Sequence, residues 1–271
     1  MVGIEKTAAE WHAEDLERIN KFRLMDDDFM NACFADNIEA TELVLRIILN
    51  NKDIIVKSVE TQKTMKNLQG RSLRLDVVAS DGGKNFNVEV QRADKGANPR
   101  RARYHQSILD ANTTFPDEEF DQVSDIYVIF ITENDILKGN LPVYTVDRYI
   151  KELQKPFADG EHIIYVNGSW DDDSAIGKLM HDFRCTVPDE MYYAELADRA
   201  RYFKSDEKGV ASMCKAMEDM RNEAERIGME KQTVNIALSM LEDGSYSYEQ
   251  IAKITKMPLD EVMALDTKRP A

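Results

Sequence analysis

Apolar and polar residues alternate along two neighbouring stretches of the chain, residues 73–80 and 85–92. Alternation with a period of two is typical of β-strands that bury one face. The stretch Asp81-Gly82-Gly83-Lys84 lies between them, and a Gly-Gly pair favours a two-residue turn because glycine adopts positive φ without strain. The pattern therefore predicts an antiparallel hairpin.

The predicted turn determines which residues of the hairpin face each other. With the two glycines as the loop, Asp76 lies directly opposite Glu89, and Arg74 lies opposite Gln91. The other face then carries the apolar residues Leu73, Leu75, Val77, Phe86, Val88 and Val90. We therefore expect one face of the hairpin to belong to the core and the other to carry the four polar side chains.

Two carboxylates in facing positions repel each other, because their Cβ atoms lie about 4.5–5.5 Å apart in an antiparallel pair. A divalent cation such as Mg²⁺ removes this repulsion, since carboxylate oxygens are its preferred ligands in proteins. Asp76 and Glu89 are therefore candidate metal ligands. The alternative is that Arg74 neutralises the pair on a solvated face.

The remaining apolar patterns outline a mixed α/β domain. Residues 126–131 form a near-continuous apolar run, as in a central strand covered on both faces. Helices are expected over Trp11–Phe22, Met25–Phe34, Ile38–Leu49, Pro99–Ala111 and Tyr149–Leu153, and strands over Ile54–Gln62, Asp125–Thr132 and His162–Val166. We place this domain at residues 21–187, after an N-terminal helix or tail at residues 1–20.

Residues 188–271 form a C-terminal region of helical composition. Apolar positions there recur at alternating steps of three and four, as in the seam of a coiled coil. The seam consists of Val210, Met213, Met217, Met220, Ala224, Ile227, Lys231, Val234, Leu238 and Leu241. It predicts a homodimer joined through the helix from Val210 to Leu241. The alternative is a helix folded back on the domain at residues 21–187, with Gly228 marking a break.

Two short helices are expected at the C-terminal end. Ser247-Tyr248-Glu249-Gln250 fits a capping box that opens the first, and Pro258 begins the second. The layout resembles a helix-turn-helix. However, the second helix carries Asp260, Glu261 and Asp266 and no Arg, Asn or Gln that could read bases. A packing or partner-binding role is therefore favoured over DNA recognition.

Composition adds two constraints. The net charge of −15 opposes nucleic-acid binding, because lysine and arginine supply most of the non-specific affinity for phosphate. Three dispersed cysteines and an N-terminus without an apolar stretch favour a reducing, cytoplasmic setting with no membrane span. Basic residues nevertheless gather directly after the hairpin, at Arg92, Lys95, Arg100, Arg101 and Arg103; a solvated helix face is the alternative interpretation.

The helix expected after the hairpin separates these arginines by face. Arg100 and Arg103 follow helical spacing on one side, whereas Arg101, Tyr104 and Ile108 form a row that points inward. Arg100 and Arg103 are therefore the better candidates for contacts with phosphate.

Arg74-Leu75-Asp76 followed by Glu89-Val90-Gln91 resembles the Asp…Glu-x-Lys core of the PD-(D/E)XK nuclease superfamily. The form is similar to that of its Rpn-type branch, the recombination-promoting nuclease family transposases. Further similar segments are Met25–Met30, Leu68–Arg71, Gln91–Asp94, Arg101–Tyr104, Tyr127–Thr132 and Lys178–Phe183. The resemblance runs from about Asp26 through the C-terminal helices, and residues 70–104 are its most specific part.

The resemblance implies a restriction-endonuclease-like mixed sheet flanked by helices. It also implies a metal-dependent DNA endonuclease with duplex DNA as its partner. Asp76 and Glu89 would hold Mg²⁺ or Mn²⁺, the backbone carbonyl of Val90 would be a further ligand, and Gln91 would position water.

The same resemblance extends the site. In the superfamily an acidic residue of the preceding helix often joins the metal site, which makes Glu42 and Asp26 secondary candidates, with capping or surface roles as the alternative. Arg74 would join Arg100 and Arg103 in holding the substrate. A dimer would bring two such sites to one duplex.

One residue departs from the superfamily pattern. Gln91 stands where the motif usually has lysine, so the site lacks a cation that would orient water and stabilise charge on phosphate. Slow or conditional activity is one expectation. The alternative from another class is a weak or inactive nuclease-fold protein that acts in assembly. RNA as substrate also stays open, because nothing in the sequence reads a 2′-hydroxyl.

Overall fold

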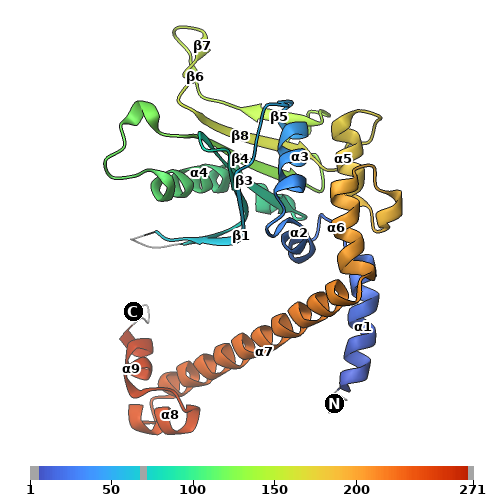
Figure 1. The fold of residues 1–271 in the computed structure, drawn as a ribbon. Coiled ribbons are helices and arrows are strands. Elements are labelled where there is room, and N and C mark those ends of the chain that lie inside the picture. Colours follow the sequence, from blue (N-terminus) through green and yellow to red (C-terminus); the bar gives the residue numbers. More distant parts are fainter. Residues whose placement is uncertain (1–5, 68–71, 268–271) are drawn as a thin grey trace. The chain divides into compact units, whose positions relative to one another are not determined.

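The computed structural model describes residues 6–67 and 72–267, so the segment Leu68–Arg71 of the motif resemblance lies outside the described residues. The chain is α/β, with a six-stranded mixed sheet flanked by helices and a helical C-terminal part (Figure 1). Over residues 6–67 and 72–267, no helix combines the length and the apolar character that crossing a bilayer requires.

The sheet has the strand order β1-β2-β3-β4-β8-β5. β1, β2 and β3 pair antiparallel, β3, β4 and β8 pair parallel, and β5 pairs antiparallel with β8 at the edge. The strands are β1 Ser58–Met65, β2 Leu73–Ser80, β3 Lys84–Gln91, β4 Asp125–Thr132, β5 Val143–Val146 and β8 Glu161–Asn167. The parallel strands end together, because Gln91 lies beside Thr132, and Thr132 lies beside Asn167.

The predicted hairpin and its register are confirmed. Val77 pairs with Val88 and Ser80 pairs with Asn85, which is the register that a Gly-Gly loop requires. Only the first glycine, Gly82, has a positive φ, of 95°, as in a type II′ turn. The turn is braced because Asp81 Oδ1 accepts hydrogen bonds from the two following backbone amides, of Gly83 and Lys84, at 3.0 and 2.7 Å.

Helices cover both faces of the sheet (Figure 1). On one face lies α4, which packs on β1 and β4; α2 and α3 contact the β1–β2 side of the sheet and pack against α5 and α6. The helices are α1 Ala8–Lys21, α2 Asp27–Phe34, α3 Ile38–Ile48, α4 Pro99–Thr113, α5 Ala175–Arg184 and α6 Ala194–Ser205. Asn98 caps α4 as expected, since its side chain accepts a hydrogen bond from the Arg100 amide at 2.8 Å.

Most of the polar face of the hairpin is buried, contrary to one alternative from the sequence, although Arg74 near its end is exposed. Val78 packs in the same core cluster as Ala102 and Ile108 of α4. Asn87, from the neighbouring strand, is fully buried and contacts His105 of α4. Both faces of the hairpin are therefore core, and polar side chains near its end must be satisfied inside the protein.

Two expected elements differ in the structure. The helix expected over Tyr149–Leu153 is wrong, because Tyr149–Ile150 (β6) pairs with Lys155–Pro156 (β7) as a small hairpin whose turn contains Gln154 at a φ of 52°. The first strand begins at Ser58 instead of Ile54. Just before it, the Val56 amide donates to the Glu42 carboxylate at 2.9 Å.

The described residues form two compact units that meet after Val210, so the second unit begins beyond α6. The reason is that α6 belongs to the first unit, where it packs against α1, α2 and α3. The buried Lys204 Nζ on α6 donates to the carbonyls of Asn20, Phe22 and Thr186 at 3.1, 2.5 and 2.5 Å.

The second unit begins at Ala211 and consists of helices over its described residues, 211–267. The single long helix expected from the seam is α7 (Glu207–Asp243), and it runs through Gly228 without a break. The capping box at Ser247 opens α8 (Tyr248–Thr255) as predicted, and α9 (Leu259–Thr267) follows. Their core is formed by Ala237, Leu241, Ile251 and Val262. The C-terminal end of the seam therefore packs within its own chain.

Candidate active site

The strands β2 and β3 part at the residues that the register predicts to face each other. Their ladder ends at Val77 and Val88, and the next two residues are Asp76 and Glu89. There the Asp76 amide donates to Glu89 Oε1 at 3.1 Å, and the Val90 amide donates to Asp76 Oδ2 at 3.3 Å. Each carboxylate thus accepts a hydrogen bond from the opposite strand, and the structure brings the two together.

Both carboxylates are buried. Glu89 is 0% exposed and Asp76 is 9% exposed. Burial raises the pKa of Glu89, and the neighbouring charge of Asp76 raises it further. Burial also raises the pKa of Asp76, followed by the charge of Asp27. The surroundings therefore do not fully stabilise the negative charge of Asp76 and Glu89, which together form the centre of the site. A bound cation would stabilise that charge.

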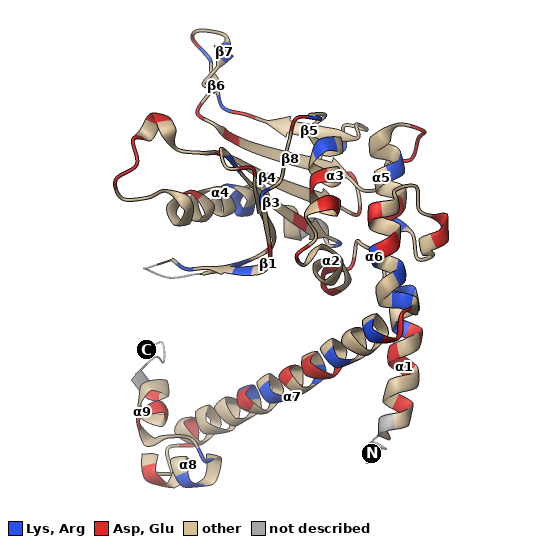
Figure 2. Ribbon diagram, viewed as in Figure 1, with Lys and Arg blue, Asp and Glu red and all other residues tan. Residues whose placement is uncertain are grey.

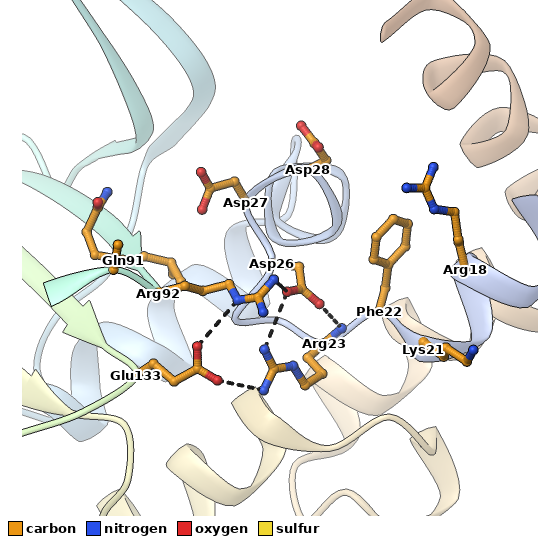
Figure 3. A pocket seen from close by; sticks show the side chains of 12 residues that line it. Arg18, Lys21, Phe22, Arg23, Asp26, Asp27, Asp28, Gln91, Arg92 and Glu133 are labelled. Carbon is orange, nitrogen blue, oxygen red and sulfur yellow. Dashed lines mark hydrogen bonds and ion pairs between the residues drawn. The ribbon is translucent and has the colours of Figure 1, made fainter. Parts of the chain in front are cut away.

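Asp27 is a third acidic residue of the centre. It is the first residue of α2, and its charge acts on Asp76. Loss of hydration raises the pKa of Asp27, and the adjacent Asp28 adds to the effect. Figure 3 shows Asp27 extending from α2 toward the side of Gln91, whereas Asp28 points away. An oxygen ligand from the N-terminus of α2 is therefore available to the site.

The two acidic residues proposed from the sequence have other partners. Asp26 accepts from the Arg23 amide at 2.8 Å and pairs with Arg92 at 2.9 Å. Glu42 pairs with Arg46 at 2.7 Å, in addition to its bond with the Val56 amide. Asp27 was missed because an acidic triplet at a helix start gives no signal for which member faces the sheet.

Arg101 of α4 reaches into the centre. Its guanidinium donates to Glu89 Oε2 at 3.2 Å and to Gln91 Oε1 at 3.2 Å. Two further bonds hold it, to the carbonyl of Gly96 at 3.0 Å and to His105 Nε2 at 3.1 Å. The prediction that Arg101 points inward is confirmed, but its contact with the carboxylate was missed, since helical spacing specifies a face and not a partner.

His105 lies beneath the carboxylates and is fully buried. Burial, followed by the charge of Arg101, lowers its pKa to about 4, so the ring is neutral. Because the guanidinium always carries its protons, His105 Nε2 accepts and the ring proton lies on Nδ1. That atom lies 3.1 Å from the side-chain amide of Asn87 and 3.6 Å from Glu89 Oε1, the latter beyond hydrogen-bond distance. His105 thus holds Arg101 in place and packs beside Glu89.

Gln91 lies against the short 3₁₀ helix η1 (Asp94–Ala97). A Cβ atom at Gly96 would lie 1.8 Å from Gln91 Oε1, so only glycine permits the observed position of this amide. Gln91 also lines the cleft described below, together with Val90 and Asp27. The structure therefore places Val90 and Gln91 at a surface that a substrate can reach, whereas Glu89 is fully buried beside them.

The other basic candidates lie around this centre. Arg74 is exposed. Its positive charge offsets part of the rise that burial causes in the pKa values of Asp76 and Asp27. Arg100 and Arg103 are exposed on the first two turns of α4, where Figure 2 shows positive charge beside the sheet. The side chain of Lys95 lies outside the described part of the chain.

A cleft of about 810 Å³ lies next to the site, where Asp27, Val90 and Gln91 line it but Asp76 and Glu89 do not (Figure 3). An ion-pair network forms one wall: Arg92 pairs with Asp26 and Glu133 at 2.9 and 3.3 Å, and Arg23 pairs with Glu133 at 2.9 Å. These bonds join the loop before α2 to the ends of β3 and β4. The other lining residues include Arg18, Lys21 and Phe22 from the end of α1.

The donor chemistry fits a hard divalent cation. All three acidic groups offer carboxylate oxygens, which Mg²⁺ and Mn²⁺ prefer. Within the described residues, no group of three or more His, Cys, Asp or Glu side chains is assembled in metal-binding geometry. Arg101 instead contacts one of the Glu89 oxygens. A cation at Glu89 would therefore share its carboxylate with this guanidinium or replace it there.

Comparisons with protein-family models, curated proteins and solved structures find no match to this chain. A function for the chain therefore has to come from the geometry and chemistry of the site, set beside the motif resemblance of Asp76, Glu89 and Gln91.

Proposed function

We propose that this protein is a metal-dependent nuclease that hydrolyses phosphodiester bonds of DNA. The observation that carries the proposal is the pair of buried carboxylates, Asp76 and Glu89, each bonded to the backbone of the opposite strand. Burial of two adjacent negative charges is costly unless a cation or a proton compensates them. Asp76 near the start of β2 and Glu89 near the end of β3 lie next to Val90 and Gln91, which line a cleft that a substrate can enter.

In this proposal Asp76 and Glu89 hold Mg²⁺ or Mn²⁺, with Asp27 and the Val90 carbonyl as further oxygen ligands. The cation supplies positive charge that polarises the scissile phosphate and acidifies the attacking water. Gln91 positions that water through its amide group. The water loses a proton as its oxygen bonds to phosphorus; the bond to the leaving sugar oxygen breaks, and that oxygen takes up a proton.

The substrate is held by positive charge outside the carboxylates. Arg74, Arg100 and Arg103 are exposed near the centre and suit contacts with the phosphates on either side of the cleaved bond. The six-stranded sheet with its site at the end of β3 agrees with the restriction-endonuclease-like core that the motif resemblance implies. The dispersed cysteines favour a cytoplasmic setting, and the resemblance implies a role in DNA recombination.

Cleavage of supercoiled plasmid tests this proposal. We expect the purified protein to nick or linearise plasmid with Mg²⁺ or Mn²⁺ and to be inactive with excess EDTA. Asp76→Asn and Glu89→Gln should each lower the rate by at least about 100-fold, because an amide replaces a charged ligand. Arg201→Met, on the surface of α6 beside Asp189 and Asp198, serves as the matched control. Equal activity of the wild type and both carboxylate variants would overturn the proposal.

A second candidate is a non-catalytic assembly protein that retains the fold. The feature that favours it is the apolar surface of α7, where Met220 is 38% exposed and Ile227 is 37% exposed. The absence of a lysine at Gln91 also favours it. A wild-type protein that binds Mn²⁺ and self-associates but leaves every plasmid intact would support this candidate over the nuclease.

A further inference from the structure

The candidate site contains a positively charged side chain, although its Glu-x-Gln segment carries no positive charge. Gln91 occupies the position of the motif lysine and carries no charge. The guanidinium of Arg101 donates to Gln91 Oε1 and to Glu89 Oε2, both at 3.2 Å. The positive charge of Arg101 therefore lies within hydrogen-bond distance of the uncharged Gln91 side chain. Arg101 belongs to α4, whereas the motif lysine would belong to β3.

Hydrogen bonds to neighbouring residues fix the position of the Arg101 guanidinium in the site. Its Nε donates to the neutral ring of His105, one turn along the same helix, and a terminal nitrogen donates to the Gly96 carbonyl. The nitrogen that donates to Gly96, Nη1, also donates to Gln91 Oε1, and Nη2 donates to Glu89 Oε2. The bonds to His105 and Gly96 therefore fix the plane of the group beside the carboxylate and the amide. The side chain remains 38% exposed, so it is not sealed from a bound phosphate.

We propose that Arg101 supplies, at the scissile phosphate, the positive charge that the nuclease motif ordinarily takes from a lysine at position 91. The inference rests on the proposed nuclease function and adds a catalytic residue to it. A guanidinium is charged at every working pH and presents several donors in a fixed plane, which suits the oxygens of a phosphate that gains charge during the reaction. Gln91 then orients the group as well as the water.

The competing explanation is that Arg101 only balances the charge of Glu89 in the metal-free protein. The two explanations differ in what Arg101→Met does. If Arg101 is only a counter-ion, its removal would strengthen metal binding and leave cleavage at saturating metal unchanged. As the cation that contacts phosphate, its removal would lower cleavage even when metal is saturating.

The experiment measures single-turnover plasmid cleavage at saturating Mn²⁺ and, in parallel, the rise in thermal midpoint that Mn²⁺ produces. Its variants are Arg101→Met, Arg101→Lys, and Gln91→Lys combined with Arg101→Met. We expect Arg101→Met to cleave about 100-fold more slowly, the usual effect of removing one such donor. Its response to Mn²⁺ should be at least that of the wild type. Arg101→Lys should retain more activity than Arg101→Met, and Gln91→Lys should restore at least about tenfold to Arg101→Met by returning the charge.

The outcomes separate this inference from the nuclease proposal. An active wild type with an equally active Arg101→Met overturns the inference alone. A slow Arg101→Met that has also lost its response to Mn²⁺, and that Gln91→Lys does not rescue, assigns Arg101 a structural role and overturns it as well. A wild type that cleaves nothing overturns the nuclease function and this inference with it.

Discussion

Glu89 shows how a single residue can serve a site at the expense of the fold. It is fully buried, its pKa is raised by burial and by Asp76, and among the residues that the structure describes Arg101 alone pairs with it as a full opposite charge. The folded protein therefore keeps a proton on this carboxyl at pH values where the unfolded chain, near its ordinary value of 4.5, has released it. Stability linked to this group is thus present at low pH and is lost as the pH rises.

Glu89→Gln should consequently stabilise the metal-free protein at alkaline pH. The amide has no charge to bury and can still accept the hydrogen bond from the Asp76 amide. We expect its thermal midpoint in EDTA to exceed that of the wild type by about 2–4 °C at pH 9, the shift that 1 kcal/mol produces in a domain of this size. The difference should shrink at pH 5. A variant no more stable than the wild type at pH 9 would show that Glu89 is adequately compensated without metal.

The centre was predictable from the sequence only where a local rule determined the geometry. The Gly82-Gly83 turn set the register, and the register placed Asp76 beside Glu89. No comparable rule distinguishes Asp27 from Asp26, because which of them reaches the strands depends on how α2 packs on β2. Arg101 was expected to point inward, but its partner is determined by the depth at which α4 lies on the sheet, which helical spacing does not specify.

At the scale of elements, the junction between β3 and α4 positions the site. β3 ends at Gln91, η1 follows at once, and α4 begins at Pro99. Gly96 lets the turn approach the Gln91 side chain, and its carbonyl anchors Arg101. A short connection of this kind thus holds both residues that we propose to act on water and phosphate.

Gly96→Ala tests the role of this junction. The new methyl group would collide with Gln91 Oε1, which must then move and leave Arg101. We expect a loss of cleavage of about tenfold or more, with a smaller loss of stability, because the side chain displaced is only half-buried. Activity is measured on plasmid and stability by thermal melting.

Gly228→Ala is the matched control for that variant. Nothing lies within 4 Å of a Cβ atom at Gly228, which is in the middle of α7. The substitution should raise stability by about 0.5–1 kcal/mol through helix propensity and leave cleavage unchanged. Equal activity of Gly96→Ala and Gly228→Ala would mean that the position of Gln91 does not matter.

Elements with strong periodicity were predicted well, and the weaker ones were not. β4 spans Asp125–Thr132 as its apolar run indicates, and α7 follows its seam. The apolar pattern of Tyr149–Leu153 is too short to distinguish a helix from a strand. In the structure a turn with Gln154 at positive φ lets Tyr149–Ile150 pair as a strand with Lys155–Pro156. The edge strand β5 was not expected, because its four residues depend on pairing with β8.

At the scale of the whole molecule, α7 carries the prediction of a homodimer. The seam is divided in the structure: Leu241 packs in the core of α7, α8 and α9, whereas Met220 and Ile227 remain exposed. Burying such side chains is worth roughly 1.5–3 kcal/mol each. We therefore still expect self-association, through the middle of the helix and not along the full seam from Val210.

Light scattering on the intact protein and on Met220→Glu combined with Ile227→Glu tests this expectation. The wild type should have the mass of a dimer and the double variant that of a monomer, because two charges would face their copies across the seam. A monomeric wild type would contradict the dimer, and a dimeric double variant would place the interface elsewhere.

The net charge of −15 also belongs to this scale. It would repel DNA over most of the surface, so the proposed binding would depend on the local positive charge of Arg74, Arg100, Arg101 and Arg103 and on bound cations. The proposed metal site is therefore decisive, because a cation there would both neutralise the buried carboxylates and attract the phosphate.

That claim is tested most directly by anomalous diffraction from crystals of the protein grown with millimolar Mn²⁺. We expect a peak between Asp76 and Glu89, within about 2.0–2.6 Å of an oxygen of each carboxylate, as hard cations require. Crystals of Glu89→Gln grown in the same way should lack it. Ordered Asp76 and Glu89 side chains with no peak between them, and with Arg101 still bonded to Glu89, would contradict the account.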